Sequence, residues 1–337
     1  MIRPVATGLL ACTSALALSV SACAESETSE TEAIDAAAAA AAAAAEAEAA
    51  VQDAEPAVEE GPAPGADAIA AAPDSAWRTV DPENLLRITT TQGVVWVELA
   101  DAFAPTHTAR MRELARMDWY DFKVWHRVLD DFMAQGGGAL DNPSVQPPTQ
   151  PIAAEFTMRR SPDALAISEL QDRPVNPRAR MGMAKAGFWN GFPAMTQPAA
   201  AAGIMGDGRV ESWLVHCDGA AAMARTADPN SANAQFYIVR GEAEHLNTQY
   251  TVWGKVRDGL DVVYALEEGT LGEDGGFRPD FIEDISVASD LPAGEQVTVQ
   301  VMDTDSAAFA AYLDALRGED GALPDLCEIT VPSRVTE

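Results

Sequence analysis

Residues that could bind a metal or carry redox chemistry are scarce in this chain of 337 residues, which has four cysteines and four histidines. The cysteines stand at positions 12, 23, 217 and 327, so no pair has the CxxC spacing of zinc sites or thioredoxin-like proteins. No HExxH pattern occurs either. The sequence therefore predicts neither a metal site nor a cofactor.

Positive charge is also in short supply. The chain has 22 Lys and Arg against 52 Asp and Glu, which gives a formal net charge of -30. Such a chain repels the phosphates of nucleic acids, and its copies repel one another. We therefore expect no nucleic-acid partner, and we expect a monomer.

No apolar run is long enough for a mature transmembrane helix. The run Val5–Val20 follows the single charge of Arg3 and predicts a signal peptide over residues 1–22. It ends in VSAC, which resembles the lipobox of bacterial lipoproteins, where the chain is cut before a cysteine that then carries a diacylglyceryl group. The resemblance implies a lipid anchor on Cys23 and therefore contact with a membrane.

The residue after this cysteine is alanine rather than aspartate, which by resemblance to lipoprotein sorting rules implies a periplasmic protein anchored to the outer membrane. The alternative is a soluble secreted protein cut near Ala22 or Ala24, with an incidental cysteine. Residues 23–76 lack Lys and Arg and contain an alanine run at 36–45 and a Pro-rich part at 56–73. We predict that they form a disordered linker.

The next segment has the pattern of a β protein. Residues 85–90 and 94–99 alternate around Gln92-Gly93, which predicts a hairpin, and Thr106 or Thr108 can cap a helix that ends near Met117. A second helix is expected over 259–267. Further short strands are expected at 124–128, 132–135, 220–224, 235–239 and 251–256. Many short strands with two helices predict a β-barrel or sandwich.

The last residues, 271–337, predict an appendage packed on this β structure. Strands are expected at 282–288, 297–302 and 329–331. Residues 306–317 carry Phe309, Tyr312, Leu313 and Leu316 at helical spacing, which predicts a helix that docks through one apolar face.

Three blocks in fixed order carry a family resemblance. They are WHRVLDDFMAQGG at 125–137, AMARTADPNSANAQFYI at 222–238, and YTVWGKV at 250–256 followed by GLDVV at 259–263. They resemble the FHRVIxxFMxQGGD, MARxxDPNSAxSQFFI and VFGxVxxGMDVV blocks of cyclophilin-type peptidyl-prolyl cis-trans isomerases, which are also called rotamases. We therefore expect an isomerase domain over about 77–270.

The resemblance implies a mainly β fold, a closed eight-stranded antiparallel barrel capped by two helices. Residues 161–216 fall between barrel strands of the family, so we expect them to form a large loop insertion near the binding groove.

Rotation about an X-Pro bond breaks no bond and needs no nucleophile. The barrier is about 18–20 kcal/mol because the amide has partial double-bond character. The prolyl nitrogen becomes basic only when the amide twists, so a donor aimed at it lowers the barrier. The resemblance assigns this role to Arg127, whose guanidinium is always charged and rigid. The alternative is an ordinary surface ion pair.

The proline ring needs an apolar slot, and the resemblance implies Phe132, Met133, Tyr237 and Leu246 for it. Read without the family, the first three are ordinary core residues. Gln135 is expected to bond the substrate backbone, and otherwise would close a barrel strand. The other substrate-binding positions that the resemblance implies are Ala224, Arg225, Thr226, His245 and Tyr250.

Cys217 and Cys327 could pair in an oxidising periplasm and would then staple the appendage to the barrel. Two free buried cysteines are the alternative.

The function expected from these features is an isomerase that acts on proline-containing polypeptide clients in the cell envelope. The alternative is a non-catalytic chaperone or scaffold that binds proline segments through the same groove and the insertion. The intact set of Arg127, Phe132, Met133 and Gln135 favours the enzyme.

Overall fold

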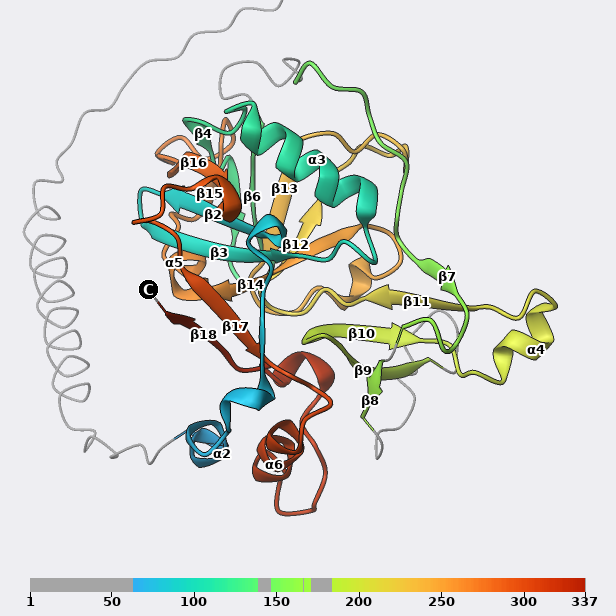
Figure 1. Ribbon diagram of the computed structural model, residues 1–337. Helices are drawn as coiled ribbons and strands as arrows, with labels where there is room; N and C mark the ends of the chain where they lie inside the picture. Colours follow the sequence, from blue (N-terminus) through green and yellow to red (C-terminus); the bar gives the residue numbers. More distant parts are fainter. Residues whose placement is uncertain (1–62, 139–146, 166, 171–183, 337) are drawn as a thin grey trace, which may run out of the picture. The chain divides into compact units, whose positions relative to one another are not determined.

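The computed structural model describes residues 63–138, 147–165, 167–170 and 184–336. Within these ranges the strands form antiparallel sheets of ten, five and three strands (Figure 1). The mainly β class expected from the sequence is confirmed. No helix of the described part is both long and apolar enough to cross a membrane.

The largest sheet, which we call the main sheet, has the strand order β15-β5-β6-β13-β12-β14-β3-β2-β16-β4. Its strands are β2 (Leu85–Thr90), β3 (Gly93–Leu99), β4 (Lys123–Val124), β5 (Arg127–Leu129), β6 (Met133–Gly136), β12 (Ala220–Met223), β13 (Phe236–Val239), β14 (Val252–Asp258), β15 (Gly269–Thr270) and β16 (Phe281–Val287).

The expected closed barrel of eight strands needs correction in detail. Eight of the ten strands have three to seven residues, and the two edge strands, β4 and β15, have two residues each. A bridge between Val124 and Gly138 brings β4 back beside the end of β6, so the sheet curls toward closure. The result is a curled sheet with two very short edges, which leaves little backbone open to pairing with other chains.

The predicted hairpin is confirmed as β2 and β3, which pair from Leu85 opposite Glu98 to Thr90 opposite Gly93. The Thr90 hydroxyl accepts the amide N–H groups of Gln92 and Gly93 and so closes the turn. Gly93 has a φ of 143°, a conformation that residues with a side chain rarely adopt.

Two helices cover the main sheet, α3 (Pro105–Arg116) and α5 (Leu260–Tyr264), as expected (Figure 1). The predicted threonine cap of α3 is wrong, because Thr106 and Thr108 lie inside the helix and Ala104 is the N-cap. Pro105 begins the helix instead, and the Glu155 carboxylate accepts the free amide N–H groups of Thr106 and His107. A cap from a residue about fifty positions away leaves no local signal in the sequence.

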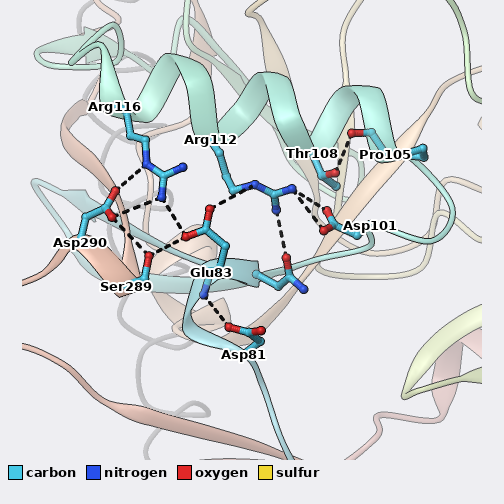
Figure 2. Close-up of polar contacts among 10 residues, drawn as sticks. Asp81, Glu83, Asp101, Pro105, Thr108, Arg112, Arg116, Ser289 and Asp290 are labelled. Carbon is cyan, nitrogen blue, oxygen red and sulfur yellow. Dashed lines mark hydrogen bonds and ion pairs between the residues drawn. The ribbon is translucent and has the colours of Figure 1, made fainter.

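Two arginines of α3 connect the helix to neighbouring segments of the chain through an ion-pair network (Figure 2). Arg112 and Arg116, one helical turn apart, contact Asp101 at 3.0 Å and Glu83 at 2.8 Å respectively. Arg116 also reaches Asp290 at 2.7 Å. The network joins the helix to the segments that flank the neighbouring strands β2, β3 and β16.

The insertion is a sheet rather than the loop we expected. Its strands are β7 (Met158–Arg160), just before the expected insertion, and β8 (Ser168–Glu169), β9 (Lys185–Trp189), β10 (Phe192–Thr196) and β11 (Val210–Leu214) within it. They pair in the order β7-β11-β10-β9-β8, and helix α4 (Ala201–Met205) connects β10 to β11. Asn190 and Gly191 join β9 to β10 with φ values of 48° and 82°. An Asn-Gly dipeptide between two apolar runs is a strong hairpin signal, but the prediction of a loop over 161–216 did not take it into account.

The C-terminal residues also differ from the expected appendage. Strand β16, assigned to it from the sequence, pairs with β2 in the main sheet. A three-stranded sheet joins β1 (Trp77–Thr79), β17 (Thr298–Met302) and β18 (Ser333–Thr336), with β17 in the centre. The strand expected at 329–331 is wrong, since a 3-10 turn over Leu326–Glu328 and strand β18 flank those residues. The helix expected at 306–317 is α6 (Ala307–Ala315), capped by the Ser306 hydroxyl.

Part of the expected linker is ordered. Helix α2 (Ala66–Ala70) and a 3-10 turn over Asp74–Ala76 lie within residues 23–76, and the side chains of α2 pack against α6 and its neighbours. The signal peptide, Cys23 and the alanine run lie outside the described residues.

The buried residues of the described part form three hydrophobic clusters, of which two make up the cores behind the main sheet and beside it. The first fills the main sheet and includes Trp125, Phe236 and Trp253, whose rings meet edge to face. The second, which we call the outer core, joins the N-terminal segment, the insertion and the C-terminal residues. Its large members are Trp77, Phe188, Trp213, Phe309 and Tyr312. The C-terminal residues therefore pack on the insertion as well as on the main sheet.

A covalent bond and a buried ion pair connect these parts. Cys217 and Cys327, 110 positions apart, form a disulfide. On the main sheet, Arg257 pairs with Glu98 at 2.7 Å and donates to the carbonyl of Gly191 at the tip of the β9–β10 hairpin. Glu98 also accepts from Arg78 of β1 at 2.8 Å. Removal of one partner would leave a buried charge uncompensated, so these contacts fix the insertion in place.

Candidate active site

The side chains of the central strands point alternately to the two faces of the main sheet. In β13, Phe236 and Ile238 belong to the main-sheet core, whereas Tyr237 and Val239 belong to a third apolar cluster on the opposite face. In β6, Ala134 faces the main core and Met133 faces the third cluster. Because side chains alternate along a strand, the family blocks place every second residue on this outer face.

The register of three neighbouring strands then places Arg127, Gln135 and Tyr237 in one row. Arg127 of β5 lies opposite Gln135 of β6, which lies opposite Tyr237 of β13. Directly opposed residues in antiparallel strands point to the same face. Residues from the first and second blocks, about a hundred positions apart, therefore meet by strand pairing.

The Arg127 guanidinium lies over the Phe132 ring, 5.8 Å from its centre, and is half-buried. No carboxylate of the described residues lies within ion-pair distance of it, unlike the arginines of α3. This geometry argues against the surface ion pair that the sequence left open. Gln135 is also half-buried, and its amide Nε2 donates to Gln235 Oε1 at 3.2 Å.

The apolar positions implied by the family meet in the third cluster. Met133 and Tyr237 are among its buried members, at 2% and 4% exposure, so they form the wall of the slot and are as buried as core residues. Phe132, Leu246 and Tyr250 pack on them and are half-buried. We call the set of Arg127, Gln135 and these apolar residues the candidate site.

The rim of the candidate site is aromatic. His245 is exposed and stacks on Phe132 with a ring separation of 5.6 Å, and Tyr250 meets Tyr237 edge to face at 6.0 Å. Insertion residues, among them Phe192 and Leu214, complete the same cluster. The insertion thus builds part of the wall behind the candidate site.

The second block supplies a cation to the rim. The Arg225 guanidinium lies 4.3 Å from the Tyr250 ring centre and 5.4 Å from that of Phe156, and it donates to the carbonyls of Gln249 and Thr226. The backbone N–H of Ala224 donates a hydrogen bond to the Gln235 carbonyl and so holds this segment. The Thr226 hydroxyl is turned into its own exposed loop, where it donates to Ser231. The structure therefore brings together all the proposed site residues except the side chain of Thr226.

The sequence reading missed His216, which is fully buried behind the candidate site. Its ring Nε2 lies 3.1 Å from the Tyr237 hydroxyl, and its Nδ1 lies 3.0 Å from Asn247 Oδ1. Burial lowers the pKa of His216 to about 4, although the bond to Asn247 acts to raise it, and burial raises the pKa of Tyr237. The signal was the tyrosine itself, because a hydroxyl in an apolar slot needs a buried partner.

The prediction that the chain has no metal site stays a prediction. In the described part of the chain the carboxylates of Glu242 and Glu244 approach the Cys327 sulfur, all within 4.8 Å. That sulfur is bonded to Cys217 and offers no thiolate.

The chain is similar to known proteins over the segment that carries these residues. The family model of cyclophilin type peptidyl-prolyl cis-trans isomerase/CLD matches residues 85–287. A probable peptidyl-prolyl cis-trans isomerase of Brucella suis biovar 1 is 29% identical over 211 residues, which are 62% of this chain and 85% of that protein. The isomerase cyp18 of Streptomyces antibioticus is 28% identical over 214 residues, which are 61% and 96% of the two chains.

A solved structure extends the similarity. The crystal structure of cyclophilin AquaCyp293 from Hirschia baltica has a TM-score of 0.67 and 37% identity, and the alignment covers 77% of this chain and 93% of that one. This share is more than residues 85–287 alone could supply, so the similarity continues outside the family segment. The chain belongs to the cyclophilin family of peptidyl-prolyl cis-trans isomerases.

Proposed function

We propose that this isomerase accelerates X-Pro rotation by a hydrogen bond from Arg127 to the prolyl nitrogen. The observation that carries the proposal is the half-exposed guanidinium over Phe132, in one row with Gln135 and Tyr237. No carboxylate of the described residues competes for it, so its donors remain available to a substrate.

The nitrogen accepts a hydrogen bond only when the amide twists, so the bond forms in the transition state and not in the planar substrate. A hydrogen bond from a charged donor contributes about 1.5–3 kcal/mol. Because this stabilisation is absent from the ground state, it lowers the barrier rather than merely strengthening binding.

The remaining groups would position the substrate. The half-buried faces of Phe132 and Leu246 offer apolar surface that a proline ring would cover. Gln135 gives one N–H of its amide to Gln235. Its second N–H has no acceptor among the described residues and would donate to a substrate carbonyl, which would fix the chain direction across the site.

The partners would be proline-containing polypeptides of the cell envelope, and the protein would be a lipid-anchored monomer in the periplasm. Residues 1–23 support the anchor, since they combine an apolar signal with VSAC. The Cys217–Cys327 disulfide supports an oxidising compartment. Radioactive palmitate should label the wild-type chain and not Cys23→Ala, and equal labelling would exclude the anchor.

The catalytic proposal is tested by a protease-coupled assay of the full chain with a proline tetrapeptide. We expect Arg127→Ala to lower kcat/KM about 10- to 150-fold, which corresponds to the lost charged hydrogen bond. Arg127→Lys should recover only part of it, because the single ammonium lacks the rigid fork.

The matched control is Arg116→Ala, which removes an arginine from the α3 network without touching the candidate site. Its kcat/KM should equal that of the wild type. An inactive wild-type chain that still binds the peptide would instead support the non-catalytic chaperone. An active Arg127→Ala variant would remove the proposed mechanism.

A further inference from the structure

His216 joins two separate walls of the candidate site. Its ring reaches Tyr237 on strand β13, and its backbone and ring reach the segment Ala243–Asn247, which carries His245 and Leu246 on the rim. The His216 carbonyl accepts the Ala243 amide at 3.0 Å, and Asn247 Oδ1 accepts the His216 amide at 2.9 Å. One residue therefore binds both ends of the rim segment.

The hydrogen-bond roles in this arrangement follow from one acceptor. Asn247 Oδ1 already accepts the His216 backbone amide, so the neighbouring ring Nδ1 must carry the proton that it donates to the same oxygen. In the neutral ring, Nε2 is then an acceptor, and the Tyr237 hydroxyl donates to it. The two rings lie nearly parallel, with an interplanar angle of 16°.

Among the described residues, neither the His216 Nε2 nor the Tyr237 hydroxyl has another hydrogen-bond partner. His216 is 0% exposed and Tyr237 is 4% exposed, so water cannot replace the lost bond of either. A buried polar group without a partner is costly, so the pair holds the tyrosine ring in one orientation. That ring faces Tyr250 at the rim and stands in row with Gln135.

We propose that His216 is a positioning residue of the isomerase site, which holds Tyr237 and the Ala243–Asn247 segment in fixed relation so that the apolar wall fits a proline ring. The proposal rests on the proposed function. It assigns His216 no contact with the substrate and no proton transfer.

The test is a double-mutant cycle on the full chain in the same proline tetrapeptide assay. His216→Leu fills a similar volume but leaves the Tyr237 hydroxyl without a hydrogen-bond acceptor. We expect kcat/KM to fall about 10- to 100-fold, because the apolar wall is then displaced from the substrate. In the Tyr237→Phe background the hydroxyl is gone, so the same substitution should cost less than about twofold. An equal loss in both backgrounds would overturn the proposal.

Two further readouts separate positioning from loss of fold. His216→Gln keeps a donor and an acceptor, so it should recover most of the activity. Long-range proton–nitrogen spectra of the wild type should show His216 as the Nδ1–H tautomer at pH 7, and the Nε2–H tautomer would contradict the pairing. His107→Gln, at a buried histidine bonded to Glu155 outside the candidate site, is the matched control and should keep full activity.

A failure of the proposed catalytic function can be distinguished from a failure of the role of His216. If the wild-type chain and Arg127→Ala are equally inactive, the catalytic proposal fails, and binding of the tetrapeptide Ala-Ala-Pro-Phe becomes the measure. His216→Leu should then raise the Kd of the tetrapeptide about tenfold when Tyr237 is present, and should leave it nearly unchanged in the Tyr237→Phe variant. An unchanged Kd would overturn the role of His216.

Discussion

At the scale of single residues, the site depends on which side chains keep a partner and which do not. Arg127 and Arg116 are both arginines of the same chain, yet Arg116 is held by Glu83 and Asp290 whereas Arg127 lies over an aromatic ring. A held guanidinium stabilises the fold, and one without a carboxylate can serve a substrate. The difference lies in the surroundings, so residue type alone could not assign the roles.

The burial of His216 predicts a dependence of stability on pH. Its pKa is lowered to about 4 in the folded chain, from 6.5 when unfolded. Between these values the unfolded chain binds the additional proton, so stability falls as pH decreases, by up to about 1.4 kcal/mol per pH unit. From pH 7 to 5, urea unfolding should therefore show a loss about 2 kcal/mol larger in wild type than in His216→Gln. Identical losses would contradict the buried neutral histidine.

At the scale of helices and strands, local pattern gave good predictions where partners are close in sequence. The hairpin of β2 and β3, helix α6 with its Ser306 cap, and the core strands of the family blocks all lie within one or two residues of their expected bounds, apart from the split of 124–128 into β4 and β5. In the insertion sheet, the β9–β10 hairpin carried a local signal in Asn190-Gly191 that the prediction did not use, whereas β7 pairs with β11 across about fifty residues and left no local signal. His216 was missed for the same reason, since its role depends on contacts with Tyr237 and Asn247.

Helix α3 offers a prediction at this scale. The Glu155 carboxylate accepts two amides of the first turn and contacts His107 Nδ1 at 2.6 Å. Burial acts to raise the pKa of Glu155, but these hydrogen bonds outweigh it and lower the pKa. Glu155→Gln should therefore destabilise the chain by about 1–3 kcal/mol at pH 7.

The matched control for this substitution is Glu113→Gln, which removes an exposed carboxylate paired with Arg110 on the same helix. Exposed pairs contribute less than about 1 kcal/mol. Because the lowered pKa of Glu155 stabilises the fold only while the group is ionised, the difference between Glu155→Gln and wild type should shrink as the pH falls below 4.5. Chemical denaturation at several pH values measures both effects, and a difference that grows on acidification would contradict the cap.

At the scale of the whole molecule, the disulfide connects parts that the sequence separates. The bond between Cys217 and Cys327 closes a loop of 110 residues. In the chain-entropy model, a cross-link of this span stabilises the folded state by about 4–5 kcal/mol. Reduction, or Cys217→Ser with Cys327→Ser, should lower the free energy of unfolding by that order, and an unchanged denaturation midpoint would show that the bond contributes nothing.

The outer core draws residues from before 85, from the insertion and from after 287. Its central strand β17 pairs with β1 on one side and β18 on the other. A truncated chain that contains only residues 85–287 would lose the side chains that bury Trp213 and Phe188. It would therefore expose a large hydrophobic patch to solvent. A stable shortened form of this protein must therefore extend beyond the family segment 85–287 and keep the residues on both sides of it.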